Sequence, residues 1–322
     1  MRLLRGLQNI PADFPGCVAT IGNFDGLHRG HRQILDALKV ASQQDQLPTL
    51  VMLFEPHPKE FFAGDKAPPR LANLREKLMD LRDAGVDYVL CIPFNKEFSA
   101  LSTEAFIQQV LLDGVKVKHL IVGDDFRFGS GRSGDYKTLA AAGVVHGFNV
   151  DDSPTHCIYG ARASSSRVRA VLGDDDLETA KTLLSRDYRM FGRVGYGRQL
   201  GRTLNAPTAN VMVKRRNLAM SGVFAVRAQV HETGECFTGV ANLGRKPTLG
   251  GELKPSLEVH LFGFSGDLYG KHLNTEFLHK IRDERKFDSL EALQAAIARD
   301  ISDAKSYFSS ISSADASGIG SD

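Results

Sequence analysis

The order of hydrophobic patterns along the chain divides it into two parts of different fold class. Up to about residue 185, short apolar runs such as VATIGNF, LPTLVMLFEP, VDYVLCIPF and KHLIVGDDF alternate with amphipathic stretches such as RGHRQILDALKVASQQ and LREKLMDLRDAG. This alternation predicts βαβ units, and therefore an α/β domain with a parallel sheet. Ligands of such sheets bind at the carboxyl ends of the strands, where GNFDG, FEPHP and GDDFRFG follow here.

Residues 186–310 show a different pattern. FGRVGYG, GVFAVRAQVHE, ECFTGVANLG and LEVHLFGF indicate strands separated by Gly, Pro and Asn turns, which predicts an antiparallel barrel or sandwich. A last helix is expected over SLEALQAAIARDISDAKSYF. Its apolar stripe could dock on the sheet; the stripe consists of Leu290, Leu293, Ala296, Ile297 and Ile301. Residues 311–322 are rich in Ser, Gly and Ala, so we expect a disordered tail.

Composition agrees with two globular domains and excludes some functions. The length of 322 residues exceeds one average domain, and 42% hydrophobic residues are enough for two cores. With 40 basic and 38 acidic residues the net charge is only +2, which gives no electrostatic case for binding nucleic acid or an anionic membrane. No obligate protein partner is evident.

Cysteine spacing and the N-terminus indicate a cytoplasmic protein. Cys17, Cys91, Cys157 and Cys236 are widely separated and form no CxxC pair, so neither a disulfide framework nor a structural zinc site is expected. The start of the chain has no apolar segment of signal-peptide length, and nowhere do about 18 apolar residues run together. We therefore expect a soluble protein in a reducing cytosol.

The stretch GNFDGLHRGH follows the first strong strand pattern and leads into a helix pattern. A helix that begins near Gly30 would present free backbone N–H groups and its positive dipole end to a phosphate. His28 and His31 could then both donate hydrogen bonds to charge that develops on an α-phosphate. A tight turn with two surface histidines remains an alternative. A zinc site is disfavoured because HxxH lacks the spacing of a helical metalloprotease motif.

With its surroundings, this stretch is similar to the HxGH signature of the nucleotidyltransferases related to class I aminoacyl-tRNA synthetases. More specifically, it resembles the adenylyltransferase half of bacterial bifunctional riboflavin kinase/FAD synthetases. FEPHP, VGDDFRFGSGRSGD and RASSSRVR follow in the order of that family. Taken alone, these segments would be a strand end, a glycine-rich loop and a solvated helix start.

The resemblance implies a Rossmann-like domain with His28 and His31 as catalytic residues. The nucleotide-binding residues that it implies are Gly22, Asn23, Phe24, Asp25, Gly30, Arg162, Ser164, Ser165, Ser166 and Arg169. The flavin-binding residues that it implies are Asp125, Phe126 and Phe128. Ser166 stands where Thr is common and keeps the hydroxyl, whereas some members have Asn at the position of Asp125. We assign no catalytic role to His57.

The second part contains GRTLNAPTANV and LEVHLF. Thr208 and Asn210 offer hard oxygen ligands that suit Mg²⁺ bound to nucleotide phosphates, and Glu258 could accept a proton from an attacking alcohol. Without further context, the first segment would be a turn before a strand, and Glu258 an outward charge on a half-buried strand.

The second part resembles the riboflavin kinase module, an antiparallel β-barrel with a terminal helix. The segments that carry this resemblance are GRT…PTANV, GVFAV, GVANLGRKPT, LEVHLF…DLYGK and IRDERKFDSLEAL. The resemblance implies that Thr208 and Asn210 hold Mg²⁺ and that Glu258 is the general base. The other residues that it implies are Gly201 and Thr203 for the nucleotide, and Arg285 and Phe287 for the flavin. Three positions depart from the family: Asn205-Ala206 replaces the usual Gly-Phe, and Gly263 replaces a frequent Asp.

The resemblance to both modules implies a bifunctional enzyme of flavin cofactor synthesis. With ATP and Mg²⁺ it would phosphorylate riboflavin to FMN and then transfer AMP from ATP to FMN, giving FAD and pyrophosphate. Two alternatives stay open: a nucleotidyltransferase for another phosphate with a flavin-sensing barrel, and a flavin- or RNA-binding module with degenerate sites.

Overall fold

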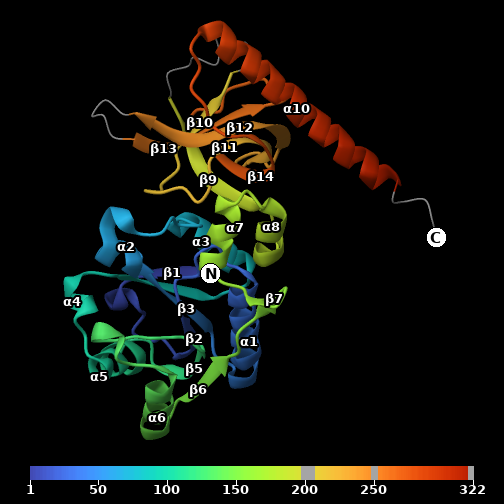
Figure 1. Cartoon of the computed structure of the whole chain (residues 1–322). Coiled ribbons are helices and arrows are strands. Elements are labelled where there is room, and N and C mark those ends of the chain that lie inside the picture. Colours follow the sequence, from blue (N-terminus) through green and yellow to red (C-terminus); the bar gives the residue numbers. More distant parts are fainter. Residues whose placement is uncertain (197–206, 248–252, 318–322) are drawn as a thin grey trace. The chain divides into compact units, whose positions relative to one another are not determined.

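The structure is a computed structural model that describes residues 1–196, 207–247 and 253–317 (Figure 1). Tertiary contacts separate two compact units, Met1–Arg167 and Val168–Asp322. The first unit contains a parallel sheet with helices and the second a closed antiparallel barrel, so the predicted α/β plus β class is confirmed.

The first unit is built on a six-stranded parallel sheet of order β1-β4-β3-β2-β5-β6. Its strands are β1 (Arg2–Arg5), β2 (Cys17–Ile21), β3 (Thr49–Glu55), β4 (Tyr88–Pro93), β5 (Val117–Gly123) and β6 (Asn149–Ser153). The four predicted strands are confirmed as β2 to β5, whereas β1 and β6 were not predicted. From β2 the chain first builds β3 and β4 on one side and then crosses to β5 on the other. The sheet therefore has its topological switch point at the carboxyl end of β2, where open α/β sheets bind ligands.

The helices of this unit follow the strand ends. They are α1 (Arg29–Asp45), α2 (Pro58–Ala63), α3 (Leu74–Asp83), α4 (Lys96–Ser99), α5 (Thr103–Phe106), a π-helix (Ile107–Leu112) and α6 (Tyr136–His146). Short 3₁₀ segments lie at Leu7–Asn9, Gly64–Lys66 and Ser130–Arg132. After β6, the hairpin β7 (Cys157–Ile158) and β8 (Ala161–Arg162) leads into α7 (Ser165–Gly173).

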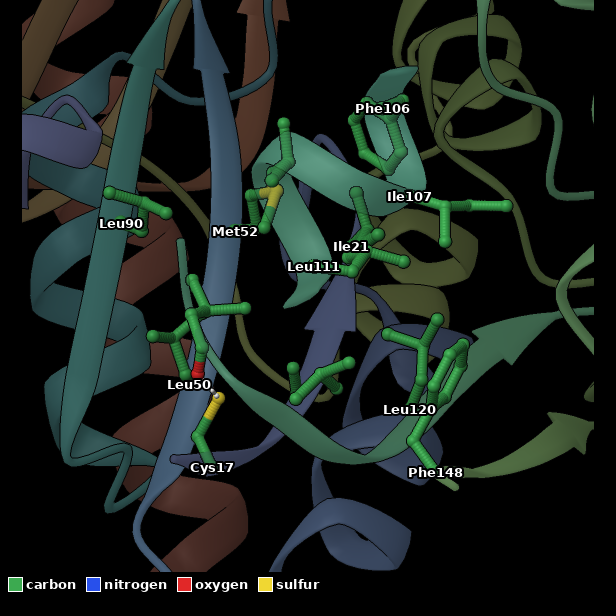
Figure 2. Close-up of a cluster of buried hydrophobic side chains, with 14 of the residues drawn as sticks. Cys17, Ile21, Leu50, Met52, Leu90, Phe106, Ile107, Leu111, Leu120 and Phe148 are labelled. Atoms are coloured by element: carbon green, nitrogen blue, oxygen red, sulfur yellow. Dashed lines mark hydrogen bonds between the residues drawn. The ribbon is translucent and has the colours of Figure 1, made fainter. Parts of the chain in front are cut away.

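Alternating side chains of the central strand serve two separate cores. Cys17 and Ile21 point to the core that includes Phe106 of α5 and the π-helix, as Figure 2 shows, and Ala19 belongs to the same core. Val18 points to the opposite core, which α1 and α3 cover with Leu38 and other apolar residues. Truncation of a large buried side chain such as Ile21 or Leu38 to Ala costs about 2–5 kcal/mol.

The second unit is a closed barrel of order β10-β13-β12-β11-β14-β9. Its strands are β9 (Tyr188–Gly195), β10 (Ala209–Val211), β11 (Gly222–Val230), β12 (Cys236–Pro247), β13 (Leu253–Leu261) and β14 (His272–Arg282). The sequence did not predict β14, because the polar residues Asn274 and Thr275 occupy buried positions and hide its alternation.

Helices cover parts of the barrel wall. Helix α10 (Leu290–Ser317) packs Ala304 and its apolar stripe on outward side chains of β11 and β12, such as Val223 and Val240. Leu290, expected in that stripe, is instead 57% exposed at the start of the helix. Residues 311–317, expected at the start of a disordered tail, continue the helix, because adding one residue to an existing helix is easier than starting one.

Helix α8 (Leu177–Leu184) packs against β9 and β14 in the second unit. The sequence placed it in the first domain, within residues 1–185. Its buried side chains form the apolar face that makes this contact: Leu177, Ala180, Leu183 and Leu184.

Candidate functional sites

The turn between β2 and α1 has an unusual backbone. Phe24 (φ 45), Gly26 (φ 87) and Leu27 (φ 46) all adopt positive φ values. This conformation is costly for Phe and Leu, so surrounding interactions must hold it in place. Both side chains are only 1% exposed and pack in the core under α1. The turn is thus a fixed cradle at the switch point of the sheet.

His28 and His31 lie at the end of this cradle. His28 is the N-cap of α1, and its Nδ1 accepts a hydrogen bond from the backbone N–H of His31 at 3.4 Å. The two imidazole rings stack with centroids 3.7 Å apart. The pair therefore stands at the helix end that carries the partial positive charge of the dipole.

His31 is held as a neutral imidazole. Burial lowers its pKa well below the usual value, and nearby positive groups, Lys77 among them, lower it further. Its buried Nδ1 has no hydrogen-bond partner among the described residues. A polar atom of this kind is costly to bury without a partner, so it is available to a ligand.

Asp25 has a structural position in the cradle. Its carboxylate is 1% exposed and accepts hydrogen bonds from the backbone N–H groups of Leu71 and Ala72, at 3.0 and 2.9 Å from Oδ1. The segment before α3 is thereby fixed to the turn before α1. The family resemblance predicts that Asp25 binds the nucleotide. In the structure its carboxylate binds two backbone N–H groups of the chain.

RASSSRVR comes to the same place from far along the chain. A Cβ at Gly30 would lie 3.3 Å from the carbonyl oxygen of Ala163, so glycine allows this close approach. Ser165 donates a hydrogen bond from Oγ to the backbone oxygen of Asp25 at 2.9 Å. Ser164 Oγ accepts from the N–H of Arg167, which caps the first turn of α7.

The remaining residues of this motif differ in their surroundings. Ser166 is exposed at the start of α7, and Arg169 is half-buried further along the helix. Arg167, which the sequence suggests as a further guanidinium donor for a triphosphate, donates instead from Nη1 to the carbonyls of Ile158 and Ala161 at 2.7 and 2.8 Å. It therefore holds the β7–β8 hairpin that carries Arg162.

Arg162 connects the serine motif to the strand end of β5. Its Nη2 lies 2.8 Å from Oδ1 of Asp125 and 3.4 Å from Oδ1 of Asp124. Three of the predicted motifs, after β2, after β5 and before α7, are thus assembled at one edge of the sheet. Gly22 and Asn23 follow β2 there, and the Gly22 backbone N–H bonds to the carbonyl of Met52.

An aromatic cluster lies beside this edge. Phe126 and Phe128 stack with centroids 5.7 Å apart, and Phe128 is 6% exposed. A tilted contact with Phe106 and then edge-to-face contacts continue the cluster through rings at the ends of β3 and β4 and in the helices that follow them, which are Phe54, Phe61, Phe62, Phe94, Phe98 and Phe106. Phe62 is 71% exposed, so the cluster presents an exposed aromatic ring to a ligand.

The second site lies on the outer wall of the barrel. Ala209 and Val211 are buried, so Asn210 between them points outward. In the strand register, Asn210 stands opposite Glu258, and Glu258 stands opposite Asn242 of β12. Directly opposed residues share one face of a sheet, so the three polar side chains form a row.

Two neighbours define the surroundings of this row. Lys246 forms a salt bridge with Glu258. Thr208 is exposed just before β10, where the carbonyl of Pro207 accepts a hydrogen bond from the ring of His260 at 2.9 Å. Gly201 and Thr203, assigned to the nucleotide, and the substituted pair Asn205-Ala206 lie outside the described residues.

The loop after β14 carries the other predicted flavin residues. The Arg285 guanidinium lies 4.9 Å from the ring centroid of Phe287, and that of Arg282 lies 5.6 Å from it. Arg282 also forms a two-pronged ion pair with the buried Asp300 of α10, with both N–O distances 2.7 Å. The loop is therefore anchored at its base.

Comparisons with known proteins match both parts of the chain. The FAD synthetase family model matches residues 10–167, and the riboflavin kinase family model matches residues 184–308. Over 310 residues, 96% of this chain and 98% of the relative, the chain is 48% identical to the bifunctional riboflavin kinase/FMN adenylyltransferase of Escherichia coli (strain K12). The chain belongs to this bifunctional riboflavin kinase/FMN adenylyltransferase family.

Other members and one solved structure extend this result. The family member of Haemophilus influenzae is 44% identical over 310 residues, 96% of this chain and 100% of the relative. A crystal structure of a macrolide-efflux protein from Streptococcus pneumoniae matches with a TM-score of 0.78 and 26% identity, over 93% of this chain and 97% of that chain. Among the described residues, no helix has both the length and the apolar composition to span a bilayer.

The adenylyltransferase unit contains two buried residues that sequence analysis did not assign to the site. His57 is 6% exposed and caps α2 by accepting from the N–H of Lys59 at 3.0 Å. Burial lowers its pKa to about 4, and the Lys77 ammonium contributes. Lys77 is 2% exposed. The burial of Lys77 could have been predicted from the sequence, because Lys77 follows Leu74 by three residues and therefore lies on the same, buried face of α3.

The kinase unit contains a contact that no sequence motif indicates. Asn242 donates from Nδ2 to Oε1 of Glu284, a residue of the loop after β14, at 3.2 Å. Sequence reasoning missed it because the two residues are far apart along the chain. The register of β12 with β13 is needed to place Asn242 beside Glu258.

Proposed function

We propose that the chain makes FAD from riboflavin in two reactions, each in its own unit. The kinase unit transfers the γ-phosphoryl group of ATP to the 5′-hydroxyl of riboflavin and releases ADP. The adenylyltransferase unit then transfers AMP from a second ATP to FMN and releases pyrophosphate. The observation that carries this proposal is that each unit assembles its own set of family motifs, within a chain that aligns with bifunctional relatives over 96% of its length.

In the kinase reaction, Glu258 accepts the proton of the attacking hydroxyl while the hydroxyl oxygen forms a bond to the γ-phosphorus and the bond to ADP breaks. The outward row of Asn210 and Glu258 supports this role, because it places an acceptor for the proton directly beside the proposed phosphate site. Lys246, paired with Glu258, is suitably charged to approach the same phosphates.

Magnesium fits the donor set of this site. Thr208 and Asn210 offer a hydroxyl and an amide oxygen, the hard ligands that Mg²⁺ takes together with nucleotide phosphates and water. Among the described residues, no three His, Cys, Asp or Glu side chains form a group that could hold a metal ion. The ion would neutralise phosphate charge, and Thr208 and Asn210 would hold it.

In the adenylyl transfer, an oxygen of the FMN phosphate attacks the α-phosphorus of ATP and the bond to pyrophosphate breaks. No nucleophilic side chain is required, because positioning and charge stabilisation carry most of such a reaction. His28 and His31 donate to the charge that develops at the α-phosphate, at the end of α1 that carries the partial positive charge of the helix dipole. The serine residues at the start of α7 and Arg162 would bind the remaining phosphates.

The aromatic cluster suits the isoalloxazine ring of FMN. Flat apolar rings stack on aromatic side chains, and Phe62 together with the half-buried Phe126 offers such a surface beside the strand ends. Arg162 holds Asp125 at the same edge. The flavin would therefore lie next to the histidine pair, with its phosphate toward α1.

The reaction is placed in the cytoplasm with small molecules as its only partners. Cys17, Cys91, Cys157 and Cys236 are all free thiols, which suits a reducing compartment. Riboflavin, FMN and ATP are the proposed substrates. Neither nucleic acid, nor a membrane, nor an obligate protein partner is part of this proposal.

A time course tests the proposed function. The purified chain is incubated with riboflavin, excess ATP and Mg²⁺, and the flavins are separated by chromatography. FMN that appears first and then gives way to FAD is the expected result. FMN alone would refute adenylyl transfer to FMN. Unchanged riboflavin in a sample that converts supplied FMN to FAD would refute the kinase reaction.

A further inference from the structure

The outer wall of the barrel carries a contact that connects the proposed kinase site to a loop. In the register of β12 with β13, Asn242 stands opposite Glu258. On its other side, Asn242 stands opposite Val223 of β11. Val223 in turn stands opposite Arg282, the last residue of β14. The row of outward side chains therefore leads from Glu258 to the start of the loop formed by residues 283–289.

Glu284 of this loop reaches back to the row. Its Oε1 accepts a hydrogen bond from Nδ2 of Asn242 at 3.2 Å. The same carboxylate lies directly over Gly244, where a Cβ would overlap all three carboxyl atoms. Gly244 lies two residues after Asn242 on the same face of β12, so the bare backbone at this position makes room for the carboxylate.

The loop is thus fixed at two points. At its base, the ion pair of Arg282 with the buried Asp300 connects it to α10, at 2.7 Å. At Glu284, the contact with Asn242 fixes it to the wall beside Glu258. Phe287, whose ring contacts the guanidinium groups of Arg282 and Arg285, belongs to the same loop.

We infer that Glu284 is a positioning residue of the kinase site, which holds the flavin-binding loop in place through Asn242 and the open face of Gly244. This inference rests on the proposed kinase function. Glu284 acts through the loop and need not contact the reacting atoms. A loop that is already ordered loses less conformational entropy when riboflavin binds, so the contact strengthens binding of the flavin rather than the phosphoryl transfer itself.

Steady-state kinetics of the full chain test this role. Glu284→Ala is expected to raise the KM for riboflavin about three- to tenfold, the range of one surface hydrogen bond, with kcat and the KM for ATP unchanged. Glu284→Gln keeps an oxygen acceptor for Asn242 and should restore the KM. Gly244→Ala, which displaces the carboxylate without changing it, should behave like Glu284→Ala. Glu235→Ala, at an exposed acid on the β11–β12 hairpin, is the matched control.

A second measurement does not depend on turnover. The chain has no Trp, so Phe287→Trp gives a single fluorescent reporter in the loop. Adding Glu284→Ala to this variant should raise acrylamide quenching about twofold, and adding Glu284→Gln should not. Circular dichroism and a thermal melt, compared with those of the native chain, report that each variant is folded.

The outcomes separate the inference from the proposed function. An unchanged riboflavin KM in both Glu284→Ala and Gly244→Ala, or unchanged quenching when Glu284→Ala is added to Phe287→Trp, would overturn the positioning role. If the native chain leaves riboflavin unphosphorylated, the proposed kinase function fails, and the quenching result alone decides whether Glu284 holds the loop. A fall in kcat at constant KM would also overturn the inference, because it would place Glu284 in the chemical step.

Discussion

Asn210 and Glu258 stand directly opposite each other on β10 and β13, both on the outer face of the barrel. If Glu258 is the general base, Glu258→Ala should lower the rate of FMN formation about 10²- to 10⁴-fold. Supplied FMN should still be converted to FAD at the native rate, because the other unit is intact. Chromatography of both reactions measures this, with Glu235→Ala as control. A folded Glu258→Ala variant that phosphorylates riboflavin normally would contradict the assignment.

The stacked histidines give the reciprocal prediction. His31→Ala should lower FAD formation from FMN about 10²- to 10³-fold, the effect of removing a donor to developing charge. FMN formation should stay unchanged. His28 also caps α1, so His28→Asn is the informative variant: Asn retains a cap acceptor but removes the imidazole. His146→Ala, at an exposed histidine at the end of α6, is the control. Loss of both activities in a folded variant would refute two separate sites.

Because the ring of Phe62 is exposed, we expect its removal to weaken FMN binding without lowering the stability of the fold. Phe62→Ala should raise the KM for FMN in adenylyl transfer about three- to tenfold, the equivalent of one aromatic stacking contact. The melting temperature should barely change, because the ring is 71% exposed. Kinetics with varied FMN and a thermal melt check both statements. Val144→Ala, at an exposed apolar residue of α6, should change neither.

His57 predicts a loss of stability on the acid side. Its folded pKa is lowered from 6.5 to about 4. Below pH 6.5 the unfolded chain therefore binds a proton that the folded chain does not bind, and stability falls until the pH reaches about 4. At pH 5 the loss from this one residue is about 2 kcal/mol relative to pH 8.

His57→Asn tests this linkage, because Asn can still cap α2. Between pH 7 and pH 5, the melting temperature of the native chain should fall further than that of the variant. Thermal melts followed by circular dichroism at both pH values measure this. An equal loss in the two proteins would show that His57 takes up its proton in the folded state as readily as in the unfolded state.

Sequence patterns predicted the elements whose apolar spacing is regular. The four central strands of the sheet and helices α1 and α3 are of this kind, as is the pairing of GNFDGLHRGH with a strand end. Strand β14 was missed because Thr275 is buried with a polar side chain, and β6 because most of its residues are polar and exposed. Periodicity detects burial of apolar residues, so it does not detect these strands.

Some residues of the candidate sites could also be predicted from the sequence. Motif order and the family resemblance indicated His28, His31 and Glu258, and their catalytic roles stay predictions. The structural position of Asp25 could not be predicted, because its partners are backbone N–H groups that only the fold brings near it. The contact of Asn242 with Glu284 likewise depends on strand register, which a single sequence does not reveal.

Closure of the barrel has a consequence for how the chain behaves at high concentration. Among the described strands of the kinase unit, the closed ladder leaves no unpaired edge to which another molecule could add, so these strands offer no template for edge-to-edge aggregation. The open sheet of the other unit ends in β1 and β6, which are short and carry exposed charges, Arg2 and Arg5 on one and Asp151 and Asp152 on the other. A strand from another molecule that paired with β1 or β6 would have to bury these charges. Charged edge strands therefore protect the open sheet from self-association, whereas closure protects the barrel.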